Sequence, residues 1–330
     1  MTRVLALDVG GTNVRFAIAQ AEPLAVTLGE HAHHPTKEFA SFEQAILSER
    51  DWFTKLGVER CAIGVAGPVN DGVCKMSNLG WTLDAKALTK TLGMPTRVIN
   101  DFEAIAFGVR YVPSDQRATL QEGTPNPLAP VAILGAGTGL GEALLLHGHK
   151  GERVMPTEGG HATLAPSDDE DAGFIAFARK KLNGGHVSVE RALSGTGLTW
   201  IVEWMEQAGL GTPSAALRAA MKAGDPAAAI GKAGADGTDP VARAAVDRFV
   251  RFYGAEAGNL ALKSIARGGV FVAGGIAPKM LSRIQAGFMR AFLDKGRMRP
   301  LLDAIPVHVI LDGDVGLRGS AASALNDDDF

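Results

Sequence analysis

The stretch LDVGGTNVRF, residues 7–16, decides the fold of this chain. An apolar run ends at the carboxylate of Asp8, the chain turns through residues 10–13, and an apolar, partly alternating segment begins at Val14. This pattern predicts two strands joined by a tight turn. Glycine lets the backbone approach a bulky anion and aim successive N–H groups at it. A carboxylate thus stands beside a candidate anion-binding turn.

A second strand, glycine turn and strand follow in the middle of the chain. Residues 131–134 are apolar, GAGTGLG occupies 135–141, and residues 142–146 resume an apolar segment. The repeat predicts two related α/β halves that face each other, and two facing glycine turns can hold a polyphosphate. GAGTGLG is neither a Rossmann fingerprint nor a Walker loop, because its glycines alternate, a strand follows and GK[ST] is missing. A single such turn is more often a plain hairpin, but the repeat and Asp8 favour phosphate.

Composition excludes several classes of protein. The length of 330 residues predicts about two domains, and the net charge of -3 with 6% aromatic residues gives no footprint of a nucleic-acid partner. No apolar run reaches the roughly 18 to 20 residues of a membrane span, and the N-terminus lacks a signal-peptide pattern. We therefore expect a cytoplasmic protein without a membrane partner. Cys61 and Cys74 lack the spacing of a zinc site and are interpreted as reduced thiols.

The remaining elements are predicted from periodicity and from turn residues. Residues 211–240, rich in Ala, Gly, Asp and Pro, read as short helices and loops in which we expect little chemistry. The aromatic residues of a long helix over 241–266 are interpreted as core. Strands are predicted at 61–65, 96–99, 269–273 and 306–311, and helices at 83–92, at 102–109 and after the last strand.

Several polar residues lie where strands or loops end, and each has a plain structural alternative. Asp101 follows an apolar strand, where cleft residues are common, but it is also a good helix N-cap, a role that Asn100 fills equally well. Glu190 alone reads as an exposed acid in the first turn of a helix. Gly274 and Gly275 fit a simple strand-to-helix turn.

Further residues allow two interpretations. Glu158 and His161 share the loop EGGH, where a metal site is conceivable, but zinc is set aside because no HExxH occurs. Trp81 suits a sugar face or the core equally. The three histidines of the segment around residues 31–34 favour a solvated surface loop over a metal site.

These motifs together resemble those of the bacterial ATP-dependent glucokinases, which belong to the hexokinase, Hsp70 and actin superfamily. The motifs DVGGTN, INDF, GAGTGLG, EGGH, HVSVERALSGTGL and GGVFVAGGI occur in that family's order and spacing over almost the whole chain, least clearly near 211–240. The resemblance implies two ribonuclease H-like α/β domains of the actin/hexokinase type with an interdomain cleft. Residues 1–111 with 316–330 would form the smaller domain and 112–315 the larger one. It also implies a homodimer.

The resemblance implies that the chain binds ATP and Mg²⁺. Asp8 would hold Mg²⁺, usually through water, near the transferred phosphate. The first turn would meet the β- and γ-phosphates, the second would meet the phosphates from the opposite domain, and a later strand end would lie against the adenosine. The residues concerned are Gly10, Gly11, Thr12 and Asn13, then Gly137, Thr138 and Gly139, and finally Gly274 and Gly275.

On the acceptor side the resemblance implies a glucose site. Asp101 would be the general base that takes the proton of the sugar 6-hydroxyl as it attacks the γ-phosphate, giving glucose 6-phosphate and ADP, the first step of glycolysis. Transfer would be direct, without a phosphoenzyme. Asn100, Glu158, His161 and Glu190 would bind the sugar hydroxyls, with Gly67, Pro68 and Asn78 near the cleft.

Three alternatives stay open. A kinase for another hexose, such as mannose or fructose, would share all these motifs. A sugar-sensing regulator on the same scaffold would carry an added DNA-binding segment, whereas strand one is predicted here from about residue 3. An actin- or chaperone-like nucleotide switch would not require EGGH together with HVSVE.

Overall fold

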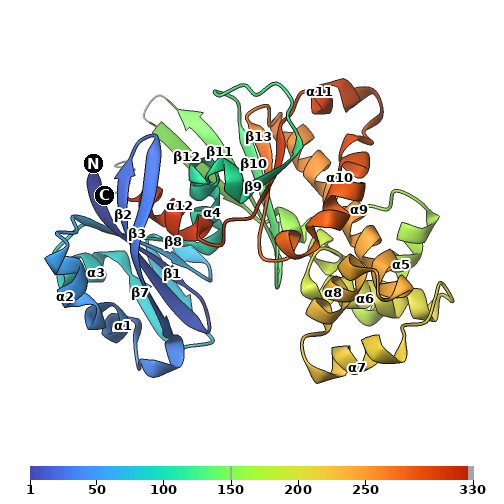
Figure 1. Ribbon diagram of the computed structural model, residues 1–330, viewed down its shortest axis with the longest axis horizontal. Helices are drawn as coiled ribbons and strands as arrows, with labels where there is room; N and C mark the ends of the chain where they lie inside the picture. Colours follow the sequence, from blue (N-terminus) through green and yellow to red (C-terminus); the bar gives the residue numbers. More distant parts are fainter. Residues whose placement is uncertain (149–150, 326–330) are drawn as a thin grey trace. The chain divides into compact units, whose positions relative to one another are not determined.

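The opening stretch folds, as predicted, into two antiparallel strands, β1 (Thr2–Val9) and β2 (Asn13–Glu22). The computed structural model describes residues 1–148 and 151–325. The chain divides into two units (Figure 1). The first comprises Met1–Gln116, His147–Pro156 and Asp312–Phe330, and the second comprises Arg117–Leu146 and Thr157–Leu311. Residues 326–330, part of the predicted domain segment 316–330, lie outside the described residues.

The first unit is built on a sheet of order β3-β2-β1-β4-β8. β1 runs parallel to β4 (Arg60–Val65), which runs parallel to β8 (Thr96–Asn100), while β3 (Ala25–Pro35) is antiparallel to β2. Residues 4–7 of β1 are all buried, because both faces of the sheet are covered. This explains why the sequence of β1 is continuously apolar rather than alternating.

One face of this sheet packs on a core that contains aromatic side chains, and the other face is covered by two helices. The aromatic core includes Phe16, Phe42 and Trp81. On the other face lie α4 (Asp101–Gly108) and α12 (Val315–Ser323), which pack side by side (Figure 1). The remaining elements of this unit are α1 (Phe42–Ser48), α2 (Arg50–Lys55), α3 (Ala85–Leu92) and the small sheet β5 (Val69–Asn70), β6 (Val73–Met76) and β7 (Trp81–Asp84).

The second sheet repeats the strand directions of the first. Its order is β12-β11-β10-β13-β14-β9, with β10 antiparallel to β11 and parallel to β13, which is parallel to β14. The same directions relate β1 to β2 and β4, so the predicted internal repeat is confirmed. The strands are β9 (Arg117–Gln121), β10 (Val131–Ala136), β11 (Leu140–Gly148), β12 (Gly151–Thr157), β13 (Gly269–Ala273) and β14 (Val307–Ile310).

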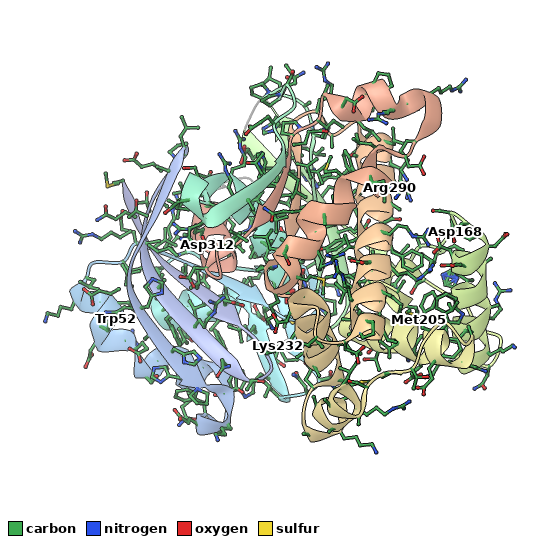
Figure 2. The ribbon with its side chains drawn as sticks, turned by 45° about the vertical axis from the view of Figure 1, so that its right-hand side comes forward. Trp52, Asp168, Met205, Lys232, Arg290 and Asp312 are labelled. Atoms are coloured by element: carbon green, nitrogen blue, oxygen red, sulfur yellow. The ribbon has the colours of Figure 1, made fainter. Side chains whose placement is uncertain are left out.

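Helices of the second unit bury an extensive apolar core. The predicted long helix is confirmed as α9 (Pro240–Ser264), and its aromatic side chains Phe249 and Tyr253 are fully buried. In Figure 2, Asp168 marks the residue before α5, and Met205 lies near the end of α6. The others are α5 (Asp169–Lys181), α6 (Gly195–Gln207), α7 (Ala215–Ala223), α8 (Pro226–Asp236), α10 (Leu281–Leu293) and α11 (Arg299–Asp303).

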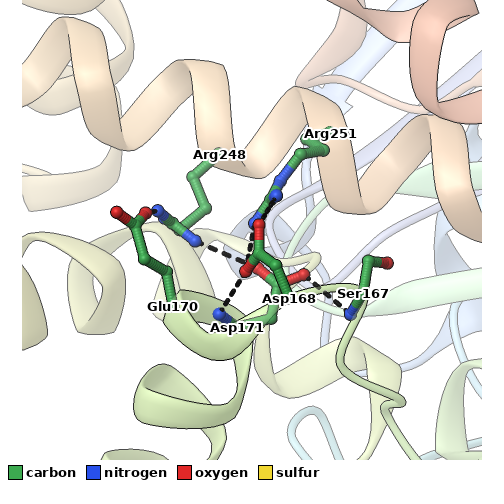
Figure 3. Close-up of polar contacts among 6 residues, drawn as sticks. All are labelled: Ser167, Asp168, Glu170, Asp171, Arg248 and Arg251. Atoms are coloured by element: carbon green, nitrogen blue, oxygen red, sulfur yellow. Dashed lines mark hydrogen bonds and ion pairs between the residues drawn. The ribbon is translucent and has the colours of Figure 1, made fainter.

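A charged network fastens α5 to α9 (Figure 3). Asp171 of α5 is 1% exposed and accepts hydrogen bonds from Arg248 Nη1 at 3.0 Å and from the Ser167 N–H at 3.0 Å. Arg251 pairs with both Asp171 and Asp168, and Asp168 caps α5. Because Asp168, Glu170 and Asp171 share two arginines, removing either cation would leave more of their negative charge uncompensated.

Three sequence interpretations are settled by packing in the first unit. The segment that contains His31, His33 and His34 is part of β3 and not a loop, and His34 Nε2 lies 2.6 Å from Glu49 Oε1. Trp81 is 4% exposed, so it belongs to the core. Both cysteines are free and buried. Across residues 1–148 and 151–325, no helix has the length and apolarity to cross a membrane.

Candidate active site

The Asp8 carboxylate stands at the end of β1 and is held by an arginine. Asp8 is paired in register with Arg15 of β2, whose Nε donates to Asp8 Oδ2 at 3.1 Å. Arg15 Nη1 also donates to Asp314 Oδ1 and to the Gly313 carbonyl, each at 3.0 Å. Asp314 is the residue that precedes α12, so Arg15 ties the carboxylate to the start of that helix.

Sequence reasoning missed Arg15, although a signal was present. In an antiparallel hairpin that turns through residues 10–13, position 8 must stand opposite a residue at the start of the second strand. A cation two residues after the turn therefore predicts a partner for Asp8. The Asp8 carboxylate, paired with Arg15 at the end of β1, keeps a side-chain exposure of 28%.

The first glycine turn is fixed from one side. The Thr36 N–H donates to the Thr12 carbonyl at 2.8 Å, and Thr36 Oγ1 donates to the Gly11 carbonyl at 3.0 Å. A Cβ on Gly11 would overlap the side-chain amide of Asn78, so a larger residue there would require that exposed side chain to move. Gly11 and Thr12 are exposed at the surface of the unit, and the turn closes through the bond from Gly10 N to Asn13 O at 2.9 Å.

Asn100, rather than Asp101, caps helix α4. Asn100 Oδ1 accepts the N–H groups of Phe102 at 2.8 Å and Glu103 at 3.3 Å. Asn100 Nδ2 donates to the Gly67 carbonyl at 2.9 Å, which brings Gly67 to this strand end. The alternative that Asp101 is the cap is thereby resolved, since Asp101 is the first residue of the helix itself.

The Asp101 carboxyl has an unusual proton affinity for an aspartate. Burial raises its pKa to about 6, the Phe102 N–H opposes this shift, and the negative charge of Asp8 adds to it. The carboxyl is therefore largely ionised at pH 7 and yet a better base than an ordinary aspartate. Burial and the Asp101 charge also raise the pKa of the Cys74 thiol, which keeps it protonated and unreactive.

The second glycine turn joins β10 to β11. Gly137 N donates to the Gly139 carbonyl at 2.8 Å, and Gly195 N at the start of α6 donates to the Gly137 carbonyl at 3.0 Å. Glu190 Oε2 accepts the Leu140 N–H at 3.1 Å, and a Cβ on Gly139 would stand 2.5 Å from that oxygen. The predicted sugar ligand Glu190 thus lies directly against the predicted phosphate turn.

A buried tyrosine hydroxyl joins the ends of two strands. Tyr253 Oη accepts the Ala136 N–H at 2.9 Å and donates to the Ala273 carbonyl at 3.2 Å. Ala136 and Ala273 are the last residues of β10 and β13, immediately before Gly137 and Gly274. The hydroxyl therefore fixes both glycine turns of this unit. The prediction that Tyr253 belongs to the core is correct, but it did not include the hydrogen bonds of the Tyr253 hydroxyl.

Replacing Tyr253 with phenylalanine tests this link. The buried Ala136 N–H would lose its acceptor, which costs roughly 1–3 kcal/mol. We expect the free energy of unfolding to fall by that amount and both glycine turns to lose part of their support. Urea unfolding measures the first effect, and amide hydrogen exchange at residues 137–139 and 274–275 measures the second. Unchanged exchange at both turns in a destabilised variant would limit Tyr253 to a role in overall stability.

A pocket of about 890 Å³ opens beside the second turn. It is lined by Gly137, Thr138 and Gly275, so three of the predicted nucleotide residues share it. Gly274 lies just behind, with a φ of 82° and no space for a Cβ, which would stand 2.6 Å from the Ala136 carbonyl. Both the positive φ and the close approach to the Ala136 carbonyl require glycine at position 274, whereas a simple strand-to-helix turn would not.

The pocket also involves residues 211–240, which contain the predicted short helices. Helix α8 forms one of its walls, with small residues that leave room and with Lys232, which Figure 2 labels. The overlooked signal is a run of small residues at helical spacing. The wall comprises Asp225, Pro226, Ala227, Ala228, Gly231, Lys232, Ala235 and Asp236.

The EGGH loop presents its two polar side chains to solvent. Glu158 and His161 have side-chain exposures of 90% and 63%, and His161 Nε2 lies 3.8 Å from Glu158 Oε2. His186 Nε2 donates to the His161 carbonyl at 3.2 Å, which joins this loop to the HVSVE segment. Within the described residues, no group of three or more His, Cys, Asp or Glu side chains is arranged to hold a metal ion.

The predicted residues thus fall into two sets, one in each unit. The first unit holds Asp8, residues 10–13, Asn100 and Asp101, and the second holds Gly137, Thr138, Gly139, Glu158, His161, Glu190, Gly274 and Gly275. The chemistry of the first set suits a carboxylate base beside an anion-binding turn. That of the second suits a nucleotide pocket beside exposed hydrogen-bonding groups.

Known proteins resemble this chain in sequence and in fold. A family profile described as Glucokinase matches residues 5–327. A glucokinase of Nostoc sp. is 37% identical, over 98% of this chain and 99% of its own length. The crystal structure of glucokinase from an Antarctic psychrotroph has a TM-score of 0.89 at 30% identity, covering 99% of this chain and 100% of that chain. A ROK family glucokinase from Streptomyces griseus, in complex with glucose and AMPPNP, has a TM-score of 0.65 at 22% identity over 98% and 99% of the two chains. These likenesses confirm the predicted fold class.

Proposed function

We propose, from the premise that this chain belongs to the glucokinase family, that it transfers the γ-phosphate of ATP directly to the 6-hydroxyl of D-glucose with Asp101 as general base. The chain is an ATP-dependent hexose kinase of that family. The residue assignments and the direct mechanism are our proposal.

The observation that carries the proposal is that Asn100 caps α4 while the half-buried carboxyl of Asp101 lies on the first turn of that helix. Asp101 is therefore not the capping residue, although its Oδ1 also accepts the Phe102 N–H at 2.9 Å. The Asp101 carboxyl has a pKa raised to about 6 by burial, with the Asp8 charge adding. A base near the working pH is the kind that accepts a hydroxyl proton efficiently in a transition state.

The nucleotide would be bound by backbone groups and by one carboxylate. We assign its phosphates to residues 10–13 and to Gly137, Thr138 and Gly139, and its adenosine to the pocket beside Gly274 and Gly275. Mg²⁺ is commonly held by one or two carboxylates together with water and phosphate oxygens, and Asp8 fits this donor set. Bound there, Mg²⁺ would neutralise the charge that develops on the transferred phosphate. Arg15 would keep the Asp8 carboxylate aimed at its site.

The sugar would be recognised by paired hydrogen bonds. Carboxylates accept from hydroxyls, while imidazole and amide groups donate or accept, so together they discriminate the arrangement of adjacent hydroxyls. We assign this role to Asn100, Glu158, His161 and Glu190. The exposed position of Glu158 and His161 leaves both free to meet a ligand.

Other features remain predictions. These are the domain boundaries at 111 and 315, the interdomain cleft, a homodimer, a cytoplasmic location, the use of Mg²⁺ and a place at the first step of glycolysis.

A panel of hexoses tests the substrate. ADP formation from Mg-ATP is measured with glucose, mannose, fructose and no sugar. We expect the highest kcat/KM with glucose and little ADP without sugar. A higher kcat/KM with mannose or fructose would replace glucose as the substrate, and equal ADP formation without sugar would favour a nucleotide switch. Acid-stable phosphate on the protein during turnover would exclude direct transfer.

The raised pKa of Asp101 predicts a pH profile. The base must be ionised to accept a proton, so activity is lost as the pH falls through about 6. We expect kcat at saturating glucose to be about tenfold lower at pH 5 than at pH 7, with a limiting slope of one. Initial rates over pH 5–8 at constant ionic strength check this. An acid limb centred near pH 4 would mean that the carboxyl is solvated during binding.

A further inference from the structure

The loop that carries Glu158 and His161 rests on strand β11. A Cβ on Gly160 would overlap the Leu140 carbonyl, and a Cβ on Gly159 would overlap the Glu142 carboxylate. Side chains two apart on a strand point to the same face, so residues 140 and 142 together support the loop. Both glycines are needed because the loop backbone lies directly on this support.

Backbone and side-chain bonds continue this contact. Thr157 Oγ1 donates to the Glu142 carbonyl at 3.0 Å and accepts the Gly159 N–H at 3.2 Å. Glu142 therefore meets the loop twice, through its backbone and through its carboxyl group. A shift of that carboxyl would move Gly159 and the two side chains that flank the glycines.

The Glu142 carboxyl is buried without a full set of partners. Glu142 is 3% exposed, and its Oε1 has no hydrogen-bond partner among the residues that the structure describes. Burial, followed by the negative charge of Glu256, raises its pKa to about 7, and Lys263 acts in the opposite direction. The carboxyl thus changes charge near neutral pH.

The charged groups around Glu142 do not compensate its ionised form. Glu256 of α9 faces it, accepts from Asn259 Nδ2 at 3.0 Å and lies 3.8 Å from Lys263 Nζ. Lys295 is attracted to Glu256 as well. Tyr253, also facing Glu142, has a pKa raised mainly by burial and stays neutral. The nearby cations are thus shared with Glu256, and an ionised Glu142 adds a second buried negative charge.

We propose that Glu142 is a positioning residue for sugar binding: its protonated carboxyl, seated beneath Gly159, holds the loop that presents Glu158 and His161 to the substrate. The inference rests on the proposed assignment of these two residues to glucose. Ionisation would draw water toward the carboxyl and displace the loop, so the binding-competent fraction falls as pH rises. Apparent affinity falls in proportion to that fraction.

Calorimetric titration of the full chain with glucose, without ATP, tests the proposal. For the wild type we expect the dissociation constant to rise about tenfold from pH 6 to pH 8, as a carboxyl with a pKa of about 7 becomes ionised. Glu142→Gln keeps the shape and remains neutral. We expect it to bind glucose at both pH values as the wild type does at pH 6. Parallel pH dependence in the two proteins would overturn the proposal.

A pair of glycine variants supplies the steric test. Gly159→Ala should weaken glucose binding at every pH, because its Cβ displaces the carboxyl or the loop. Gly173→Ala in α5 is the matched control, since its Cβ would meet Trp204 at an ordinary 3.5 Å. Circular dichroism verifies that each variant is folded. Wild-type binding by a folded Gly159→Ala would count against the proposal.

The two hypotheses fail in different ways. If folded wild-type protein neither binds glucose nor forms ADP in its presence, the proposed function is wrong. If it does both, but Glu142→Gln leaves the pH dependence of glucose binding unchanged, only the role of Glu142 is wrong.

Discussion

Asp101→Asn is expected to lower kcat with glucose by roughly 10² to 10⁴-fold, the contribution of a positioned general base. Asparagine keeps the size of the side chain but cannot accept the hydroxyl proton. Helix α4 should be unaffected, because Asn100 supplies its cap. We therefore expect a normal fold and nearly normal glucose affinity. The loss should appear in kcat rather than in the dissociation constant, as measured by a coupled ADP assay and by calorimetry.

Asp115→Asn provides the matched control for this substitution. Asp115 is exposed and lies in a 3-10 turn after α4, so the same chemical change there should leave kcat unaltered. If Asp101→Asn turns over at the wild-type rate, another group is the base. If its glucose affinity collapses with kcat, Asp101 acts mainly in binding.

Gly319→Ala is expected to destabilise the protein by roughly 3 kcal/mol, at the upper end of overpacking effects. A Cβ at this position of α12 would overlap the Ala104 carbonyl of α4, and one on Gly108 would overlap the Val315 carbonyl. The two helices thus touch backbone to backbone from both sides. The added methyl group must separate them, since a carbonyl cannot rotate away as a flexible side chain does.

The same substitution should impair catalysis. Helix α4 begins at Asp101, and near the start of α12 a Cβ on Gly316 would stand 3.9 Å from Asp8 Oδ2. Separation of the helices would therefore shift both carboxylates, so kcat/KM should fall even in the folded fraction. Gly287→Ala is the control, because its Cβ would meet Val250 at 3.5 Å and alanine favours a helix. Urea unfolding that finds Gly319→Ala as stable as the wild type would contradict this helix contact.

The sequence predicted those elements whose causes are local. The hairpin β1–β2 follows from an apolar run, two glycines and a second apolar run, and the long helix α9 follows from its periodicity. The sequence did not show which of Asn100 and Asp101 caps α4. Both are good caps, and the choice depends on the contact of Asn100 with Gly67, which is 33 residues away in the chain.

Residues with a tertiary role were the hardest to predict. The Tyr253 hydroxyl bonds to the ends of two strands, at Ala136, more than a hundred residues earlier in the chain, and at Ala273, twenty residues later. No local sequence pattern encodes these contacts. The polarity of the histidine segment predicts a loop, yet β2 pairs with it as a strand. The composition of residues 211–240 predicts short helices and loops, but it does not indicate that the small side chains of α8 line a pocket.

The return of the C-terminal segment to the first unit has a consequence for biosynthesis. Ser320 Oγ of α12 donates to the Leu7 carbonyl at 3.0 Å, so the last described helix covers the first strand. At about 5–20 residues per second, the ribosome completes α12 roughly 15–60 s after it starts β1. Throughout that interval one face of the β1 sheet has no helix α12 to bury it. We expect the second unit, whose two segments 117–146 and 157–311 are both synthesised before α12, to fold first, and the nascent first unit to be the part of the chain that engages chaperones.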